Sequence, residues 1–120
     1  MQNSPSPMRR SLTRDERLRA RRDLRRVFVS RRQVSCPGVK IKFVKNELGR
    51  DRFAVSVSRS FGNAVVRNRA KRIVREIYRN MKHELRDGFD LVIILYPGAA
   101  TYSERKGQLH SLFRKAGLIR

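Results

Sequence analysis

Apolar residues alternate with polar ones in two short stretches of the chain and run together in a third. Residues 39–43 place Val, Ile and Phe around two lysines, which predicts a strand buried on one face. Residues 53–58 repeat the alternation with small partners, and the polar stretch 46–51 predicts a hairpin-type loop joining two antiparallel strands. Residues 89–96 are nearly all apolar, so this strand is expected at the centre of the sheet, covered on both faces.

Three other stretches carry apolar residues at helical spacing. Thr13 and Glu16 have the spacing of a capping box and predict a helix that continues to about residue 30. A strong amphipathic pattern over 64–85 predicts a second helix. A last helix is expected over 103–116, with Gly117 as its stop.

The predicted order is helix, strand, strand, helix, strand, helix, which is typical of an α+β domain with helices over one face of a small sheet. The second strand, the long helix and the third strand could form a crossover unit, and the general rule expects such a unit to be right-handed. Residues 1–19 offer little to bury and predict a flexible basic tail before a single domain over 20–120.

The charge balance narrows the possible partners. The 120 residues include 30 Lys plus Arg and 10 Asp plus Glu, a formal net charge of +20. Such a charge repels itself, so a polyanion is expected to bind, with nucleic acid as the first candidate and an anionic membrane surface as the second. No apolar run approaches the ~20 residues of a membrane span. Cys36 is the only cysteine, which excludes an internal disulfide and fits a reducing cytoplasm.

Part of this charge forms a ridge on the predicted helix 64–85. Its basic members stand four residues apart: Arg67, Lys71, Arg75 and Arg79. Three like-charged pairs at this spacing destabilise an isolated helix by about 1 kcal/mol in sum, and arginine forks match phosphate oxygens. Beside the helix, the open strand face would carry Lys40, Lys42, Ser56 and Ser58. A cationic groove there suits a single nucleic-acid strand, with Phe28, Phe43 or Phe61 as candidate stacking platforms.

Catalytic groups are scarce. His83 and His110 stand in basic helical surroundings, where a surface role is more common than that of a general base. The local carboxylate cluster is Glu84, Asp87 and Asp90, which is better explained by a helix end and a turn than by a metal site. The sequence therefore predicts a binding protein rather than one with catalytic residues of its own.

Residues 53–76 closely resemble the signature of the bacterial ribonuclease P protein component. The core of this signature is Gly62-Asn63-Ala64-Val65, followed by Arg67-Asn68-Arg69, Lys71-Arg72 and Arg75-Glu76. Residues 23–28 resemble the first helix of the family and 109–115 its last, so the resemblance covers about residues 20–118. So many residue types at fixed spacing are far more specific than a basic helix.

The resemblance implies a small α/β sandwich, in which helices pack on a four-stranded sheet and the central βαβ crossover is left-handed. It implies a ribonuclease P subunit that binds one large catalytic RNA and the 5′ leader of precursor tRNA, and assists endonucleolytic removal of the leader. The RNA and its Mg²⁺ ions would carry the chemistry, so no catalytic residue, metal site or cofactor is expected on the protein. A cytoplasmic protein with no obligate protein partner is expected.

The resemblance also assigns residues by position. The RNA-facing helix would present Arg67, Asn68, Arg69, Lys71, Arg72 and Arg75. The strand end and loop beside it would add Ser56, Ser58, Arg59 and Asn63. The leader cleft would contain Leu24, Phe28 and Lys42, with Phe43 as a substitute platform after a change of register. Positions 24 and 42 are often aromatic in the family, so weaker leader stacking is expected here.

Three other functions fit parts of the pattern. A ribosomal or other structural RNA-binding protein would share the charge and size, but would not prefer precursor tRNA over mature tRNA. A metal-dependent nuclease would need the carboxylates of Glu84, Asp87 and Asp90 to act together. A membrane binder is the weakest alternative, since no helix pairs its basic face with an exposed, bulky apolar one.

Overall fold

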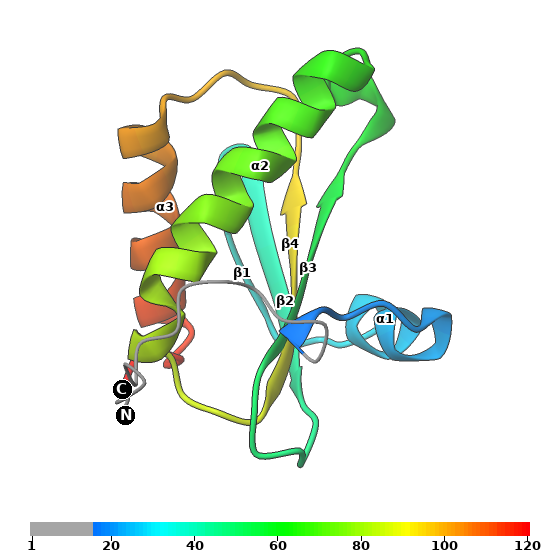
Figure 1. Ribbon diagram of the computed structural model, residues 1–120, viewed down its shortest axis with the longest axis vertical. Helices are drawn as coiled ribbons and strands as arrows, with labels where there is room; N and C mark the ends of the chain where they lie inside the picture. Colours follow the sequence, from blue (N-terminus) through cyan, green and yellow to red (C-terminus); the bar gives the residue numbers. More distant parts are fainter. Residues whose placement is uncertain (1–15) are drawn as a thin grey trace, which may run out of the picture.

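The computed structural model describes residues 16–120. The helices are α1 (Arg21–Phe28), α2 (Ala64–Met81) and α3 (Tyr102–Lys115), with single 3-10 turns at η2 (Arg59–Phe61) and η3 (Lys82–Glu84). The strands are β1 (Gln33–Cys36), β2 (Val39–Lys45), β3 (Arg52–Val57) and β4 (Phe89–Leu95), and they form one sheet in the order β1-β2-β4-β3. The predicted α+β class with helices on a four-stranded sheet is confirmed (Figure 1).

Strand β4 lies inside the sheet and joins its two halves. It pairs with β2 in antiparallel and with β3 in parallel orientation, and all seven of its residues are buried, as expected from its apolar run. The predicted hairpin between β2 and β3 is wrong, because β4 lies between these two strands. The hairpin of this sheet instead joins β2 to β1, a strand that the hydrophobic pattern did not predict, and Gly38 takes φ 86° in its turn.

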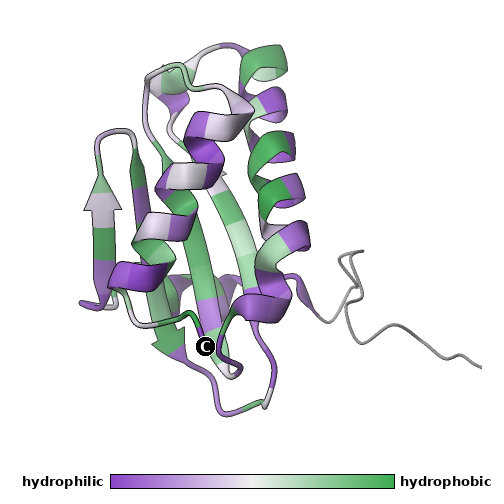
Figure 2. Ribbon diagram, turned by 90° about the vertical axis from the view of Figure 1, so that its left-hand side faces the viewer, coloured by the Kyte–Doolittle hydropathy of each residue, from purple (hydrophilic) through white to green (hydrophobic). Residues whose placement is uncertain are grey.

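Each face of the sheet carries a hydrophobic core. Ile41, Leu91 and Ile93 face α2 and α3, which cover one side of the sheet. On the other side, Val92 and Ile94 pack with Val27 of α1. The prediction of helices over one face only is therefore wrong, because the second face of β4 is also apolar and α1 covers it. Figure 2 shows the hydrophobic strands behind α2 and α3, with hydrophilic residues recurring along both helices.

The crossover from β3 through α2 to β4 is left-handed. In Figure 1, β3 and β4 both point upward, β4 lies to the left of β3, and α2 descends in front of the sheet. The two strands are parallel neighbours, so α2 is the crossover connection between them. The handedness implied by the family resemblance is confirmed, and the general right-handed rule does not hold in this molecule.

The folded domain begins earlier than expected and its first helix begins later. Helix α1 starts at Arg21, so the predicted helical start near Thr13 is wrong for residues 16–20, and Thr13 itself lies outside the described residues. Leu18 is buried in the α1-side core and its N–H donates to the carbonyl of Phe53. Residues 16–19 therefore belong to the domain rather than to a flexible tail, while 1–15 lie outside the described part.

Candidate nucleic-acid interface

Helix α2 begins at a tight junction with the loop that follows β3. The side chain of Asn63 caps the helix, since its Oδ1 accepts a 3.0 Å hydrogen bond from the N–H of Val66. A Cβ at Gly62 would lie 3.0 Å from Cγ1 of Val66, so glycine allows this close approach. No acidic residue occupies the first turn of α2, and the positive end of the helix dipole is left without a neighbouring carboxylate there.

The basic ridge of α2 is only partly open to solvent. Arg67 and Lys71 are half-buried, while Arg75 is exposed. Arg79, at the far end, forms an ion pair with Glu76. Together with Arg75, the exposed predicted residues of the helix form a surface that we call the basic face: Asn68, Arg69, Arg72 and Arg75. The structure therefore separates the six predicted helix residues into four that a partner could reach directly and two that lie along the flanks.

A groove of about 460 Å³ lies between α1, the edge strand β3 and α2, and we call it the α1 groove. Leu24 and Phe28 line it from α1, and Ser56 lines it from β3. Arg75 reaches it from α2, so it belongs to both the groove and the basic face. Phe28 is 39% exposed, which leaves its ring available to a ligand. Three of the predicted RNA and leader residues thus meet Arg75 in one depression.

The other two predicted cleft residues lie elsewhere. Lys42 is not among the residues that line the α1 groove, and its Nζ donates a 2.6 Å hydrogen bond to the carbonyl of Phe28. This places a cation at the C-terminal end of α1, where it stabilises the helix dipole. Phe43 is 4% exposed and packs edge-on against Phe89 on the opposite face of the sheet. The predicted role of Phe43 as a leader platform is therefore wrong, because its ring belongs to the core under α2 and α3.

The remaining predicted residues gather where β3 leads into α2, near the top of Figure 1. The N–H of Ser58 donates to the carbonyl of Leu95, and its hydroxyl lies 3.3 Å from that of Ser60. Arg59 is exposed on η2 and Asn63 is exposed at the helix cap. These residues extend the exposed polar surface from the N-terminal end of α2 toward the end of β3.

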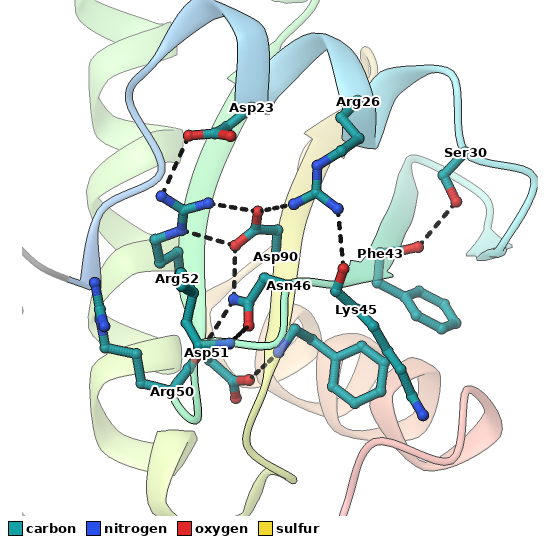
Figure 3. Close-up of polar contacts among 12 residues, drawn as sticks. Asp23, Arg26, Ser30, Phe43, Lys45, Asn46, Arg50, Asp51, Arg52 and Asp90 are labelled. Carbon is teal, nitrogen blue, oxygen red and sulfur yellow. Dashed lines mark hydrogen bonds and ion pairs between the residues drawn. The ribbon is translucent and has the colours of Figure 1, made fainter.

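A buried polar cluster, which the sequence analysis did not predict, holds α1 against the sheet (Figure 3). The carboxylate of Asp90 is fully buried and accepts two hydrogen bonds from Arg52, at 2.9 and 2.8 Å. Arg26 of α1 donates to the same carboxylate at 2.5 Å. Asp23, one turn earlier in α1, pairs with Arg52 at 3.2 Å. The cluster thus ties two positions of α1 to β3 and β4, beside the groove.

Charge and hydrogen bonding keep Asp90 ionised. Burial acts to raise the pKa of Asp90, but hydrogen bonds from Arg52 and Asn46 and the nearby positive charges hold that pKa below its usual range. The one signal in the sequence was a single aspartate within the apolar run 89–96. Its partners could not be identified, because Arg52 and Arg26 stand 38 and 64 positions away along the chain.

The three carboxylates considered for a metal site do not converge. Asp90 faces Arg26 and Arg52, whereas Asp87 pairs with Arg120 at 2.9 Å. Glu84 lies 3.8 Å from His110. Within residues 16–120, no group of three or more His, Cys, Asp or Glu side chains is placed to hold a metal ion. The same part of the chain has no helix with the length and apolar character needed to cross a membrane.

Known proteins share this chain's sequence pattern and fold. A family model described as Ribonuclease P matches residues 12–117. The ribonuclease P protein component of Dictyoglomus thermophilum is 32% identical over 114 residues, which cover 92% of this chain and 95% of that protein. The same component from Petrotoga mobilis is 40% identical over 106 residues, covering 83% and 90%. The solved RNase P protein from Thermotoga maritima has a TM-score of 0.74 at 32% identity, covering 83% of this chain and 96% of that one.

The matches extend over most of this chain and of its relatives, and they include β3, the loop after it and helix α2, which carries the basic face. The TM-score of 0.74 shows that the fold agrees with that of the solved protein. The chain therefore belongs to the ribonuclease P protein-component family.

Proposed function

We propose that this protein is the accessory subunit of a bacterial ribonuclease P. It binds one catalytic RNA and the 5′ leader of precursor tRNA, and assists removal of the leader to form the mature tRNA 5′ end. Family membership supports the partnership with a ribonuclease P RNA, and the cytoplasm, where tRNA is processed, is the proposed location.

The position of Arg75 carries this proposal. Its side chain belongs to the exposed basic face of α2 and also lines the α1 groove. A structured RNA on the basic face would therefore lie next to a single strand in the groove, with one arginine between them. This is the arrangement that a protein needs if it is to hold a leader beside the RNA that cuts it.

The two surfaces suit different parts of the substrate complex. Arg69, Arg72 and Arg75 offer guanidinium forks to phosphate oxygens, which neutralise backbone charge without reading sequence. Phe28 offers an exposed ring, and stacking of a base on such a ring stabilises a complex by about 1–3 kcal/mol. Ser56 adds a hydroxyl to the same groove. We therefore assign the structured RNA to the basic face and the leader to the α1 groove.

No metal-dependent step is assigned to the side chains of this chain. Several acidic residues of the described domain are engaged with basic partners or a helix cap, such as Asp90 with Arg52 and Glu104 with Thr101. Mg²⁺ in the proposed holoenzyme would be held by the RNA, and the protein would lower the repulsion between phosphates that come together there.

Reconstitution tests the proposal directly. The full-length protein is added to a bacterial ribonuclease P RNA at low Mg²⁺, with precursor tRNA as substrate. Faster formation of the mature 5′ end is expected, and no gain would contradict the proposal. A preference for precursor over mature tRNA would separate it from a general structural RNA-binding protein, which predicts equal binding.

Phe28→Ala tests the groove within the reconstituted enzyme. Loss of the exposed ring should weaken binding of leader-bearing precursor tRNA by at least about fivefold, while affinity for the catalytic RNA stays unchanged. Leu48→Ala is the matched control, because Leu48 is 44% exposed in the loop between β2 and β3 and does not line the groove. Equal effects of the two substitutions would remove Phe28 from the leader site.

A further inference from the structure

A second depression, of about 330 Å³, lies on the other flank of α2, and we call it the Arg105 pocket. Its walls include Phe61 and the apolar side of α2 at Ala70 and Ile73. Ala99, in the loop that crosses the top of Figure 1 from β4 to α3, closes it on another side. The volume falls within the ~300–1,000 Å³ range of small-ligand sites, and the walls are mainly apolar, as in such sites.

Arg105 of α3 gives this apolar pocket a charged group. Arg105 is 5% exposed, and burial lowers the pKa of its guanidinium. Its Nη1 donates a 3.0 Å hydrogen bond to Oε1 of Gln108. Within residues 16–120, no carboxylate lies within ion-pair distance of the Arg105 guanidinium. A guanidinium carries five N–H donors, and the hydrogen bond to Gln108 uses one of them. The pocket therefore has a donor-rich wall suited to a ligand that supplies acceptors.

The rim of the pocket adds a second arginine. Arg69 is exposed on the basic face and also lines the Arg105 pocket. At about 100° per residue, Arg69 and Arg75 are separated by about 120° around α2, so the basic face lies between this pocket and the α1 groove. A ligand in the pocket that also carries a phosphate would be continuous with a nucleic acid on the basic face.

We infer that the Arg105 pocket takes one unpaired nucleotide of an RNA, with the base between the apolar walls and the phosphate beside Arg69. The base would turn an acceptor edge toward Arg105, and guanine offers two acceptors, N7 and O6, in the spacing of an arginine fork. Unstacked bases held against apolar or aromatic side chains are the usual way in which proteins read structured RNA. The pocket and its nucleotide are inferred from the structure alone. The identification of that RNA as the catalytic RNA rests on the proposed function.

Mononucleotide titration tests the pocket without any RNA partner. In the full-length protein, GMP should shift the backbone amide resonances of Ala70, Ile73 and Ala99 and the side-chain resonances of Arg105. CMP should shift them less at equal concentration, and inorganic phosphate should affect Arg69 alone. GMP shifts confined to the α1 groove, or identical shifts with phosphate and GMP, would overturn the inference.

Ala99→Leu tests the pocket in the complex, because a larger side chain on the loop reduces its volume and leaves every charge in place. This variant should lose the GMP shifts and bind the catalytic RNA at least about fivefold more weakly, with unchanged melting. Ser111→Leu is the control, since Ser111 is exposed on α3 and does not line the pocket.

The two proposals fail in different ways. Undiminished RNA binding by Ala99→Leu, beside a clear loss in Arg72→Ala, would overturn the pocket and leave the proposed function standing. If the unmodified protein binds no ribonuclease P RNA, the proposed function fails, and the GMP titration still decides the pocket.

Discussion

Asp90 is an acidic residue inside an otherwise apolar strand, and its partners determine how α1 sits against the sheet. The carboxylate is fully buried, whereas the side chains of Arg52 and Arg26 are 19% and 40% exposed. Removing the negative charge takes the shared carboxylate from both arginines, of which Arg52 keeps Asp23 and Arg26 keeps the carbonyl of Lys45 as acceptors. The geometry of the α1 groove therefore depends on a residue that does not line it.

Asp90→Asn should lower the free energy of unfolding by about 3 kcal/mol, because breaking a buried ion pair leaves uncompensated charge. Urea unfolding at pH 7 measures this. The control is Glu76→Gln, whose exposed pair with Arg79 should contribute less than about 1 kcal/mol. Since the folded pKa of Asp90 is depressed, its stabilisation is present above the unfolded pKa and is lost as pH falls through the folded value. Equal losses of unfolding free energy in Asp90→Asn and Glu76→Gln would contradict the stabilising role of Asp90.

Asp51 should make stability fall as pH rises. Burial raises the pKa of Asp51 to about 7, although its Oδ1 accepts a 2.8 Å hydrogen bond from the N–H of Phe89. Between pH 4 and 7 the unfolded chain releases this proton while the folded chain retains it, so this contribution declines across that window and is constant above it. Asp51→Asn should therefore gain stability relative to the unmodified protein between pH 5 and pH 8 in thermal melts. If the difference in stability between Asp51→Asn and the unmodified protein does not vary with pH, the raised pKa of Asp51 is contradicted.

At the scale of the elements, α2 combines a packing face and a binding face. Val74, Ile77 and Tyr78 are buried, and the rings of Tyr78 and Phe53 stack at 4.0 Å. The opposite side carries the exposed residues Arg69, Arg72 and Arg75. The two faces can therefore be changed independently, which makes the helix a clear test of binding against stability.

Arg72→Ala should weaken RNA binding and leave the melting temperature nearly unchanged, because its side chain is exposed. If Arg72 contacts one phosphate, the slope of log affinity against log salt should decrease by about 0.7–0.9. Arg114→Ala is the matched control, because Arg114 is an exposed arginine on α3 that lines neither the α1 groove nor the Arg105 pocket. A large drop in melting with unchanged affinity would place Arg72 in the fold instead.

The local elements could be predicted from the sequence more easily than their neighbours in the sheet. Helix α2 and strand β4 follow from periodicity because each forms its pattern within one continuous segment. Strand β1 was missed, since the alternation in Gln33–Cys36 covers only four residues and the strand depends on pairing with β2. Alternation also cannot identify a strand's partner, so the insertion of β4 between β2 and β3 was not predicted.

The capping signals also show that a local pattern does not by itself determine the structure. Thr101 and Glu104 form a complete capping box at the start of α3. The same spacing at Thr13 and Glu16 does not mark the start of α1, which begins at Arg21, and Glu16 forms an ion pair with Lys82 at 2.6 Å. Likewise, the basic face lies on one helix and was predicted, whereas the Asp90 cluster joins three segments that are distant in the sequence and was not.

At the scale of the whole molecule, the excess of basic residues acts against folding as well as for binding. A net charge of +20 on 120 residues repels itself, and the described ion pairs compensate only part of it. Salt weakens interactions between exposed charges over a screening length of about 8 Å at physiological ionic strength. Stability and RNA affinity should therefore respond to salt in opposite directions.

The melting temperature of the free protein should rise between 0.05 and 0.5 M NaCl, while its affinity for RNA falls over the same range. Circular dichroism melts and filter binding measure the two quantities on one preparation. Sodium sulfate at equal ionic strength is the comparison, because a larger rise with sulfate would show effects beyond screening, namely anion binding and the general stabilisation of burial by sulfate. A melting temperature that falls with NaCl would show that attractive surface pairs outweigh the repulsion.

The place of β4 in the sheet also affects how the chain folds during its synthesis. The β1–β2 hairpin and strand β3 are made before residues 89–95, yet β2 and β3 both pair with β4. Until β4 is made, β2 and β3 lack the strand that joins them, and α1 lacks Val92 and Ile94, on which Val27 packs. The four-stranded sheet therefore cannot be completed until residues 89–95 have left the ribosome, so the basic strands and helix made before them emerge without their central neighbour.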